Sequence, residues 1–192
     1  MNPGQLELAA KTLTDSFLDY PLLKAFFPDP KVRKGKCMLF YRLFLRYGLS
    51  YGRVRYSSPQ MECVSIWLPP EAPLMTLSRQ LETGGFDWLR LGPASLYRMA
   101  RIAGQIDAVH RELNPEPHWY LAGIGTNPAY RGNGYASSLI GNFLQLERGK
   151  TSCYLETFVD SNVSYYQGLG FHLLESRPLD GCDLVLNAMR FR

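Results

Sequence analysis

The chain has 192 residues, of which 46% are hydrophobic and 20% are charged, and its formal net charge is +4. This balance is ordinary for one folded domain, and no run approaches the ~18 to 20 apolar residues of a membrane span. The positive charge is partly clustered in residues 31–46, as on a solvated helix face, without the broad basic stripe or motif of a nucleic-acid-binding protein. We therefore expect a single soluble domain, residues 1–192, with no nucleic-acid partner and no membrane partner.

The start of the chain and its cysteines indicate the compartment. Residues 1–8 contain neither a basic run nor an apolar run, so no secretory signal is visible and a cytoplasmic protein is expected. The four cysteines are dispersed and include no C-x-x-C pair. This spacing favours reduced, mostly buried thiols over a zinc site.

The first part of the chain predicts helices followed by a hairpin. Residues 5–27 keep helical spacing, and proline-containing breaks divide them into one helix and a short second piece. Residues 34–49 are again helical and apolar on more than one side, so this helix should pack deeply. Residues 51–56 and 62–68 are β-rich and flank a Ser-Ser-Pro-Gln turn, which predicts an antiparallel hairpin that ends at Pro69.

Residues 72–113 predict a pair of helices. Gly84-Gly85 and Gly92-Pro93 divide this stretch into pieces, and the second part has helical spacing. A segment of this size on a rigid scaffold often forms a lid or a binding wall. The alternative is extra packing with no role at a site.

The stretch from Glu116 to Leu144 combines a strand, a glycine-rich loop and a helix. Residues 118–126 are extended and β-rich, and Pro128 stops them because it has no N–H to donate to a ladder. After Arg131-Gly132-Asn133-Gly134, apolar residues recur at the spacing of a helix with one buried stripe. The glycines let the backbone approach a ligand, and the first N–H groups of the helix point outward with the positive end of its dipole. The pattern predicts an anion cradle, most naturally for phosphate.

The remaining residues complete an α+β pattern. Residues 152–159 predict a strand, and Asp160 or Ser161 can cap a short helix that closes at Gly170. Residues 171–174 and 183–191 predict two terminal strands. The order strand, helix, strand, helix, hairpin predicts an α+β domain on one mixed sheet.

Two motifs in this region resemble those of the GCN5-related N-acetyltransferase (GNAT) superfamily. Arg131-Gly132-Asn133-Gly134-Tyr135-Ala136 fits the loop signature of Gln or Arg, two residues, Gly, one residue, then Gly or Ala, and it lies between a strand and a helix as that motif requires. Tyr166-Gln167-Gly168-Leu169-Gly170-Phe171 matches the second signature, Tyr, three residues, Gly, Phe.

The resemblance implies the GNAT-like acyl-CoA N-acyltransferase fold, a mixed and mostly antiparallel central sheet flanked by helices. The cofactor-binding core would span about residues 116–171. The chain departs from the family in two places. Only Met1 to Gly4 precede the first helix, where the family usually has a strand, and the helical segment of about residues 72–113 is an insertion between the third and fourth family strands.

Acetyl-coenzyme A is the cosubstrate that the resemblance implies, and no metal is needed. The N–H groups from Gly132 to Ser137 would hold its pyrophosphate, and Arg131 could add a charge-assisted hydrogen bond. Its pantetheine arm would pair with strand backbone, and Gly125 could mark a β-bulge that splays the strands and frees an N–H for the thioester oxygen. The implied cofactor-binding residues are Ile124, Gly125, Thr126, Arg131, Gly132, Asn133, Gly134, Tyr135, Ala136, Ser137 and Asn162.

The reaction implied is direct attack of a neutral amine on the thioester. Tyr166 occupies the family's general-acid position and would protonate the leaving thiolate, while the adjacent Tyr165 is expected in the core. A base must deprotonate the ammonium, and Tyr120, at the position where some members have Glu, is no base at neutral pH. His118 on the same strand face and Glu156 on the next strand are the candidate catalytic bases, with a structural hydrogen bond as the alternative for each.

Other functions stay open at this point. A non-catalytic acyl-coenzyme A sensor on the same fold is opposed by the intact Tyr166 and favoured by the lack of a sure base. A dinucleotide-binding oxidoreductase is suggested because Gly132, Gly134 and Ser137 imitate G-x-G-x-x-G and Glu156 follows near the ribose-binding position, but too few residues follow Gly134 for such a sheet. The acceptor could be a small amine, an antibiotic-like amine, a peptide N-terminus or a lysine. The chain could be a monomer or a homodimer.

Overall fold

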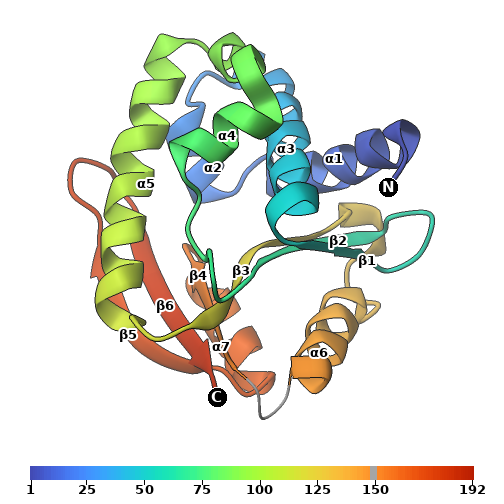
Figure 1. The fold of residues 1–192 in the computed structure, drawn as a ribbon, viewed down its shortest axis with the longest axis vertical. Helices are drawn as coiled ribbons and strands as arrows, with labels where there is room; N and C mark the ends of the chain where they lie inside the picture. The colour runs from blue at the N-terminus through green and yellow to red at the C-terminus, as the bar shows by residue number, and fades with distance from the viewer. Residues whose placement is uncertain (148–150) are drawn as a thin grey trace.

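The computed structural model describes residues 1–147 and 151–192 (Figure 1). The protein has one six-stranded sheet with helices on both of its faces. The strand order is β1-β2-β3-β4-β6-β5; the β3–β4 pair is parallel and the other neighbouring pairs are antiparallel. This confirms the predicted α+β fold on a mixed, mostly antiparallel sheet. The strands are β1 (Arg53–Tyr56), β2 (Cys63–Leu68), β3 (His118–Thr126), β4 (Ser152–Thr157), β5 (His172–Pro178) and β6 (Val185–Phe191).

Three N-terminal helices cover one face of the sheet. The first begins at Pro3 because Asn2 and Gln5 form a capping box, in which each side chain accepts the N–H of the other residue. No strand precedes it, so the strand with which the family usually opens is absent from the described residues. The predicted deep packing of the third helix is confirmed, since it fully buries Leu43, Leu45 and Tyr47. These helices are α1 (Pro3–Phe17), α2 (Pro21–Phe26) and α3 (Pro30–Tyr51).

The inserted segment between β2 and β3 is helical, as predicted. It consists of α4 (Leu77–Gly84), the 3-10 helix η1 (Gly85–Leu91) and α5 (Pro93–Leu113). Gly85 and Gly92 at the breaks have φ of 51° and 85°, a region that glycine enters without strain. In Figure 1, α5 lies alongside β5 and β6. It buries Ile102, Val109 and His110, whereas α4 buries no residue, so α5 belongs to the core of the domain.

Two helices cover the opposite face. These are α6 (Tyr135–Glu147), which follows the short 3-10 helix η2 (Pro128–Tyr130), and α7 (Asp160–Gly168). Phe143 of α6 stacks on Trp67 of β2 with ring centroids 3.8 Å apart. The cap predicted for α7 is wrong: Val159 is the N-cap without a side-chain bond, and Asp160 is already the first helical residue. No helix within residues 1–147 and 151–192 has the length and hydropathy needed to cross a bilayer.

The β-bulge lies at a different residue from the one predicted. Ile66 pairs with Gly123 and Trp67 pairs with Leu121, so the extra residue of β3 is Ala122. Gly125 is in regular register with Val64. A Cβ on Gly125 would lie 2.8 Å from Phe17 and 2.9 Å from Ser16, so its lack of a side chain serves the close approach of the last turn of α1.

Replacing Gly125 by Ala should destabilise the fold by about 1 to 3 kcal/mol, because the added methyl group overpacks the contact with α1. The melting temperature should fall by roughly 3 to 10 °C, measured by circular dichroism. Gly123→Ala is the control on the same strand, since its Cβ would meet only Phe44 at an ordinary 3.5 Å. Equal melting temperatures for the two variants would contradict this role of Gly125.

Candidate active site

Backbone pairing between β3 and β4 ends after a short parallel ladder, and the unpaired stretch between the two strands beyond it is called the slot. The two strands pair at three positions, from His118–Ser152 to Tyr120–Tyr154, and then diverge. Ile124, Gly125 and Thr126 continue to pair with β2, so β3 has a strand partner on one side only in this region. On the other side of the slot, Glu156 is partly exposed as a residue although its side chain is only 2% exposed, so its accessible part is main chain. An extended ligand could therefore pair with backbone along this gap.

The glycine-rich loop at the end of the slot has the geometry of an anion cradle. Gly132 and Gly134 have φ of 81° and 75°, and no atom lies within 4 Å of a Cβ built on either residue. The N–H of Ser138 donates to the carbonyl of Gly134 at 2.9 Å, which is the first bond of α6. The N–H groups of Tyr135, Ala136 and Ser137 precede that bond, and the helix dipole places its positive end there. That this cradle holds a phosphate stays a prediction.

Three polar side chains near the slot form hydrogen bonds with other parts of the protein. The Arg131 guanidinium donates to the carbonyl of Ser16 at 2.9 Å, which ties the loop to the end of α1. The Asn133 amide donates to the carbonyl of Tyr130 at 3.0 Å, within the loop itself. The Asn162 amide donates to the Thr157 hydroxyl at 3.1 Å. Arg131 and Asn162 thus lie beside the slot while bonded to protein atoms.

Tyr20, which sequence reasoning did not single out, connects the α1–α2 corner to the far side of the slot. Its hydroxyl accepts the N–H of Phe158 at 2.9 Å and lies 3.1 Å from the Thr157 hydroxyl. The Tyr20 ring packs edge-on against Phe17 and Phe158. The corner therefore contacts both strands, β3 at Gly125 and the end of β4 at Thr157.

Tyr166 owes its position to the way α7 ends. Gly170, with φ of 91°, donates its N–H to Gln167, and Phe171 donates its N–H to the carbonyl of Tyr166. These two bonds form a Schellman motif, and the Tyr166 and Phe171 rings pack across it with centroids 5.8 Å apart. The second sequence signature is thus a helix-ending device that fixes Tyr166.

Of the two neighbouring tyrosines, Tyr165 is more exposed than expected and Tyr166 is the buried one. Tyr165, predicted in the core, is 38% exposed, and its hydroxyl lies 3.0 Å from that of Ser137. Tyr166 is 9% exposed. Burial, with smaller contributions from Tyr20, Tyr165 and Cys63, raises the pKa of Tyr166 above its ordinary value, so its hydroxyl is a proton donor at neutral pH.

The two candidate bases belong to one buried polar cluster. The Tyr120 hydroxyl donates to Oε2 of Glu156 at 2.5 Å. Oε1 of Glu156 lies 3.5 Å from Nδ1 of His110, a residue of the inserted helix that sequence reasoning passed over. Nε2 of His110 lies 2.6 Å from Nε2 of His118, and Nδ1 of His118 lies 2.6 Å from the carbonyl of Glu116. The structure thus brings His118 and Glu156 together through His110.

The bonds of this cluster assign its protons. The Glu116 carbonyl only accepts, so Nδ1 of His118 carries a proton and, in the neutral ring, its Nε2 accepts from His110. Nδ1 of neutral His110 then needs a donor, and it faces Oε1 of Glu156; within residues 1–147 and 151–192 neither atom has a hydrogen-bond partner. One proton on Glu156 satisfies both atoms.

The pKa shifts agree with a neutral cluster. Burial, together with repulsion from His118 and Arg111, lowers the pKa of His110 to about 3. Burial also lowers the pKa of His118. For Glu156, burial outweighs the hydrogen bonds from tyrosine hydroxyls and raises the pKa to about 8. At neutral pH, Glu156 therefore holds its proton in most molecules, and both ring nitrogens of His118 are engaged.

Comparison with known proteins gives a consistent result. Residues 63–171 match the model of the acetyltransferase (GNAT) family. Three solved structures share the fold. A histone acetyltransferase and related acetyltransferase from Corynebacterium glutamicum is 21% identical, with 99% of this chain and 92% of that one covered and a TM-score of 0.70. A polyamine N-acetyltransferase from Drosophila melanogaster (15% identity, 100% and 97% coverage, TM-score 0.64) and arylalkylamine N-acetyltransferase 2 from Aedes aegypti (14% identity, 99% and 95% coverage, TM-score 0.59) are also similar.

The buried carboxyl should give the protein a recognisable pH dependence of stability. Folded Glu156 keeps its proton up to about pH 8, whereas the unfolded side chain loses it near pH 4.5, so the folded state binds more protons between these values and stability falls as pH rises. His110 has the opposite effect, but only below pH 6.5, where the unfolded ring is protonated. Between pH 6.5 and 8 the free energy of unfolding should therefore fall by up to about 1.4 kcal/mol per pH unit because of Glu156.

Denaturant titrations of Glu156→Gln between pH 6.5 and 8 check this expectation. The amide cannot ionise, so the variant should lose the descending part of the profile. Glu116→Gln is the control, because that side chain is exposed. A descending profile of equal slope in the wild type and in Glu156→Gln would show that Glu156 ionises normally in the folded protein.

Proposed function

The chain belongs to the acetyltransferase (GNAT) family, and on that premise we propose that it transfers the acetyl group of acetyl-coenzyme A to the primary amine of a small molecule. The observation that carries the proposal is the slot between β3 and β4 ending at the N-terminus of α6, where Gly132 and Gly134 leave open space. A pyrophosphate suits the helix start, and an amide-containing arm suits unpaired strand backbone.

The coenzyme would lie along the slot with its reactive end near the bulge. The N–H groups between Gly132 and Ser137 would hold the pyrophosphate, and Ile124, Gly125 and Thr126 would pair with the arm. Asn162, on the other wall, would contact the arm beside Thr157. Arg131 would reach a phosphate by exchanging its bond to Ser16, or else hold the loop in place for the coenzyme. The bulge at Ala122 supports a freed N–H for the thioester oxygen.

The reaction is acyl transfer by direct attack. The neutral amine nitrogen bonds to the thioester carbon, a tetrahedral oxyanion forms, and the carbon–sulfur bond breaks to leave the amide and the thiolate. The thiolate takes a proton, which Tyr166 would supply because burial keeps its hydroxyl protonated. The nitrogen releases its extra proton to solvent, and the tyrosinate takes one proton back from solvent, so the net proton count is unchanged.

Glu156 is the better placed of the two candidate bases. Its carboxyl group and both ring nitrogens of His118 face the buried cluster, but Glu156 belongs to β4, whose backbone borders the slot, so only a small shift or a water would connect it to the amine. Because the pKa of Glu156 is raised to about 8, its carboxylate form would become the larger fraction only above that pH. The same neutrality at pH 7 is the observation that favours the second candidate function, a non-catalytic acyl-coenzyme A sensor. A panel of amines, read by release of free thiol, separates the two.

A small amine with an apolar body fits the wall of the slot best. Phe17, Tyr20 and Phe158 pack edge-on beside the end of β4, and ring faces attract an ammonium group. Two fold neighbours are a polyamine and an arylalkylamine N-acetyltransferase, and this chain would take amines of that general kind. The four free cysteines support a reducing, cytoplasmic location.

Gly134→Val should abolish binding of acetyl-coenzyme A, because a β-branched side chain resists φ of 75° and fills the space where the phosphate would lie. In thermal-shift assays the wild type should be stabilised by acetyl-coenzyme A, by about 2.7 kcal/mol at 100 times the dissociation constant, and not by NAD. Gly104→Val, at an open position of α5, is the control. A folded Gly134→Val protein with unchanged affinity would place the cradle elsewhere, and a larger shift with NAD would contradict the coenzyme.

Tyr166→Phe should lower kcat by at least about tenfold while KM for acetyl-coenzyme A stays similar, because the ring and its packing remain and the proton donor is lost. Steady-state kinetics with the best amine of the panel provides the measurement. Tyr165→Phe removes the neighbouring hydroxyl, which bonds to Ser137, and should keep kcat within about twofold. Wild-type kcat in Tyr166→Phe, with chemistry shown to be rate-limiting, would mean that the proton comes from another donor.

A further inference from the structure

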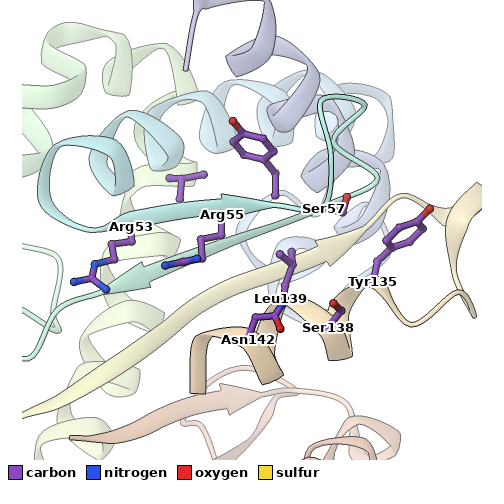
Figure 2. Close-up of a pocket in the computed structure, with 9 residues that line it drawn as sticks. Arg53, Arg55, Ser57, Tyr135, Ser138, Leu139 and Asn142 are labelled. Carbon is purple, nitrogen blue, oxygen red and sulfur yellow. The ribbon is translucent and has the colours of Figure 1, made fainter. Parts of the chain in front are cut away.

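A second cavity lies between the edge strand β1 and helix α6, apart from the slot between β3 and β4. Its volume is about 690 Å³, within the usual range of small-molecule sites. Figure 2 shows that Arg53 and Arg55 extend from β1 over this cavity, opposite the side of α6 that carries Ser138 and Asn142. None of the lining residues is acidic. The cavity is thus bounded by two cations and by neutral polar groups.

Arg55 is the cation that is available to a ligand. Its guanidinium lies 5.6 Å from the ring centroid of Phe143, which is fully buried and stacked on Trp67. No carboxylate of residues 1–147 and 151–192 forms an ion pair with it. The guanidinium thus lies near a buried ring, lines the cavity, and makes no side-chain hydrogen bond to the described residues, so its N–H donors can serve a ligand.

Arg53, two residues earlier on the same face, is already neutralised. It donates to Oε1 of Glu147 at 2.9 Å and lies 4.5 Å from the ring centroid of Trp119. A ligand that entered the cavity would therefore meet one compensated and one uncompensated guanidinium. Ser138 and Asn142, one helical turn apart on α6, add a hydroxyl and an amide whose polar atoms make no hydrogen bond to the described residues.

We propose that this β1–α6 cavity binds the phosphate group of a small phosphate monoester, with Arg55 as its charged anchor and Ser138 and Asn142 as further donors. A phosphate dianion offers three strong acceptor oxygens, which matches the forked guanidinium plus two neutral donors better than the two oxygens of a carboxylate. Leu139 lines the same cavity and would contact the carbon body of the ester. The inference does not depend on the acetyl-transfer reaction.

The phosphate could come from two sources, a free metabolite or the 3′-phosphate of the coenzyme proposed for the neighbouring slot. Glycerol 3-phosphate serves as the free monoester probe, and glycerate is its carboxylate counterpart. NMR titrations would follow the amide resonances of β1 and α6. Calorimetric titrations would compare coenzyme A with dephospho-coenzyme A.

The decisive variant is Arg55→Ala, and Arg79→Ala is its matched control. Arg79 also lies over an aromatic ring, 4.9 Å from the centroid of Tyr51, without an ion pair, but it is outside the cavity. Glycerol 3-phosphate should bind the wild type and Arg79→Ala equally, and Arg55→Ala should bind it about tenfold to hundredfold more weakly. Glycerate should bind each protein more weakly than the phosphate ester binds the wild type.

The comparison of coenzyme A with dephospho-coenzyme A identifies the source of the phosphate. If the site holds the coenzyme's own phosphate, the wild type will bind coenzyme A at least about tenfold more tightly than dephospho-coenzyme A, and Arg55→Ala will erase that difference. If the ligand is a separate metabolite, the two coenzymes will bind alike and the probe will still bind when the slot is saturated. Gly134→Val separates this inference from the proposed function, because it should lose the coenzyme and keep the probe.

Three results would overturn the inference. The first is a probe affinity that is the same in Arg55→Ala as in the wild type, with no difference between the coenzymes. The second is an equal loss in Arg79→Ala, which would indicate a general charge effect. The third is glycerate binding as tightly as glycerol 3-phosphate, which would make the site one for carboxylates.

Discussion

The two halves of the sheet are held together by one short parallel ladder, the three residue pairs from His118–Ser152 to Tyr120–Tyr154. Parallel strands normally extend such a ladder for their full length, because unpaired backbone groups are costly when buried. Here the bulge at Ala122 turns β3 away, and the last turn of α1 packs against Gly125 on the diverging strand. The backbone beyond the ladder thus stays available, and a ligand with amide groups of its own can satisfy it. The slot is a consequence of ending the ladder early.

The buried polar cluster lies directly beneath this joint and explains why the inserted helix matters. Tyr120 and Tyr154 form the last pair of the ladder, and His110 of α5 packs against both rings. The charged groups around the cluster are Asp107 and Arg111 on α5, Arg190 on β6, and Glu175 and Arg177 on β5. A buried net charge without an ion-pair partner would be costly there. One proton shared between Glu156 and His110 leaves the cluster without net charge. The insertion therefore acts at the joint of the sheet through its last turns, as part of the core.

Patterns confined to neighbouring residues predicted the fold well. The glycine loop, the hairpin of β1 and β2, the helical insertion and the helix end at Gly170 all rest on turn chemistry or periodicity within one segment. Apart from the N-cap of α7, the errors concern relations between segments. The position of the bulge depends on how β3 aligns with β2. Gly125 was therefore predicted at the bulge, whereas the extra residue is Ala122. Which of Tyr165 and Tyr166 is buried depends on how α7 is rotated against the sheet. His110 could not be found because its partners come from β3 and β4, and periodicity shows only that it is buried.

Helix α6 borders both of the proposed anion sites, and its packing makes them parts of one rigid unit. Its first turn offers backbone N–H groups to the slot, whereas Ser138 and Asn142 face the cavity under β1. Between these two sides, Ile140 and Phe143 are completely buried against the sheet, and the stack of Phe143 on Trp67 prevents the helix from rotating. Phe143 also supports the guanidinium of Arg55. Since the same residue fixes the helix and the arginine, the cradle and the second cavity keep a constant separation, and a ligand with phosphates at both ends would have to match that separation to occupy both.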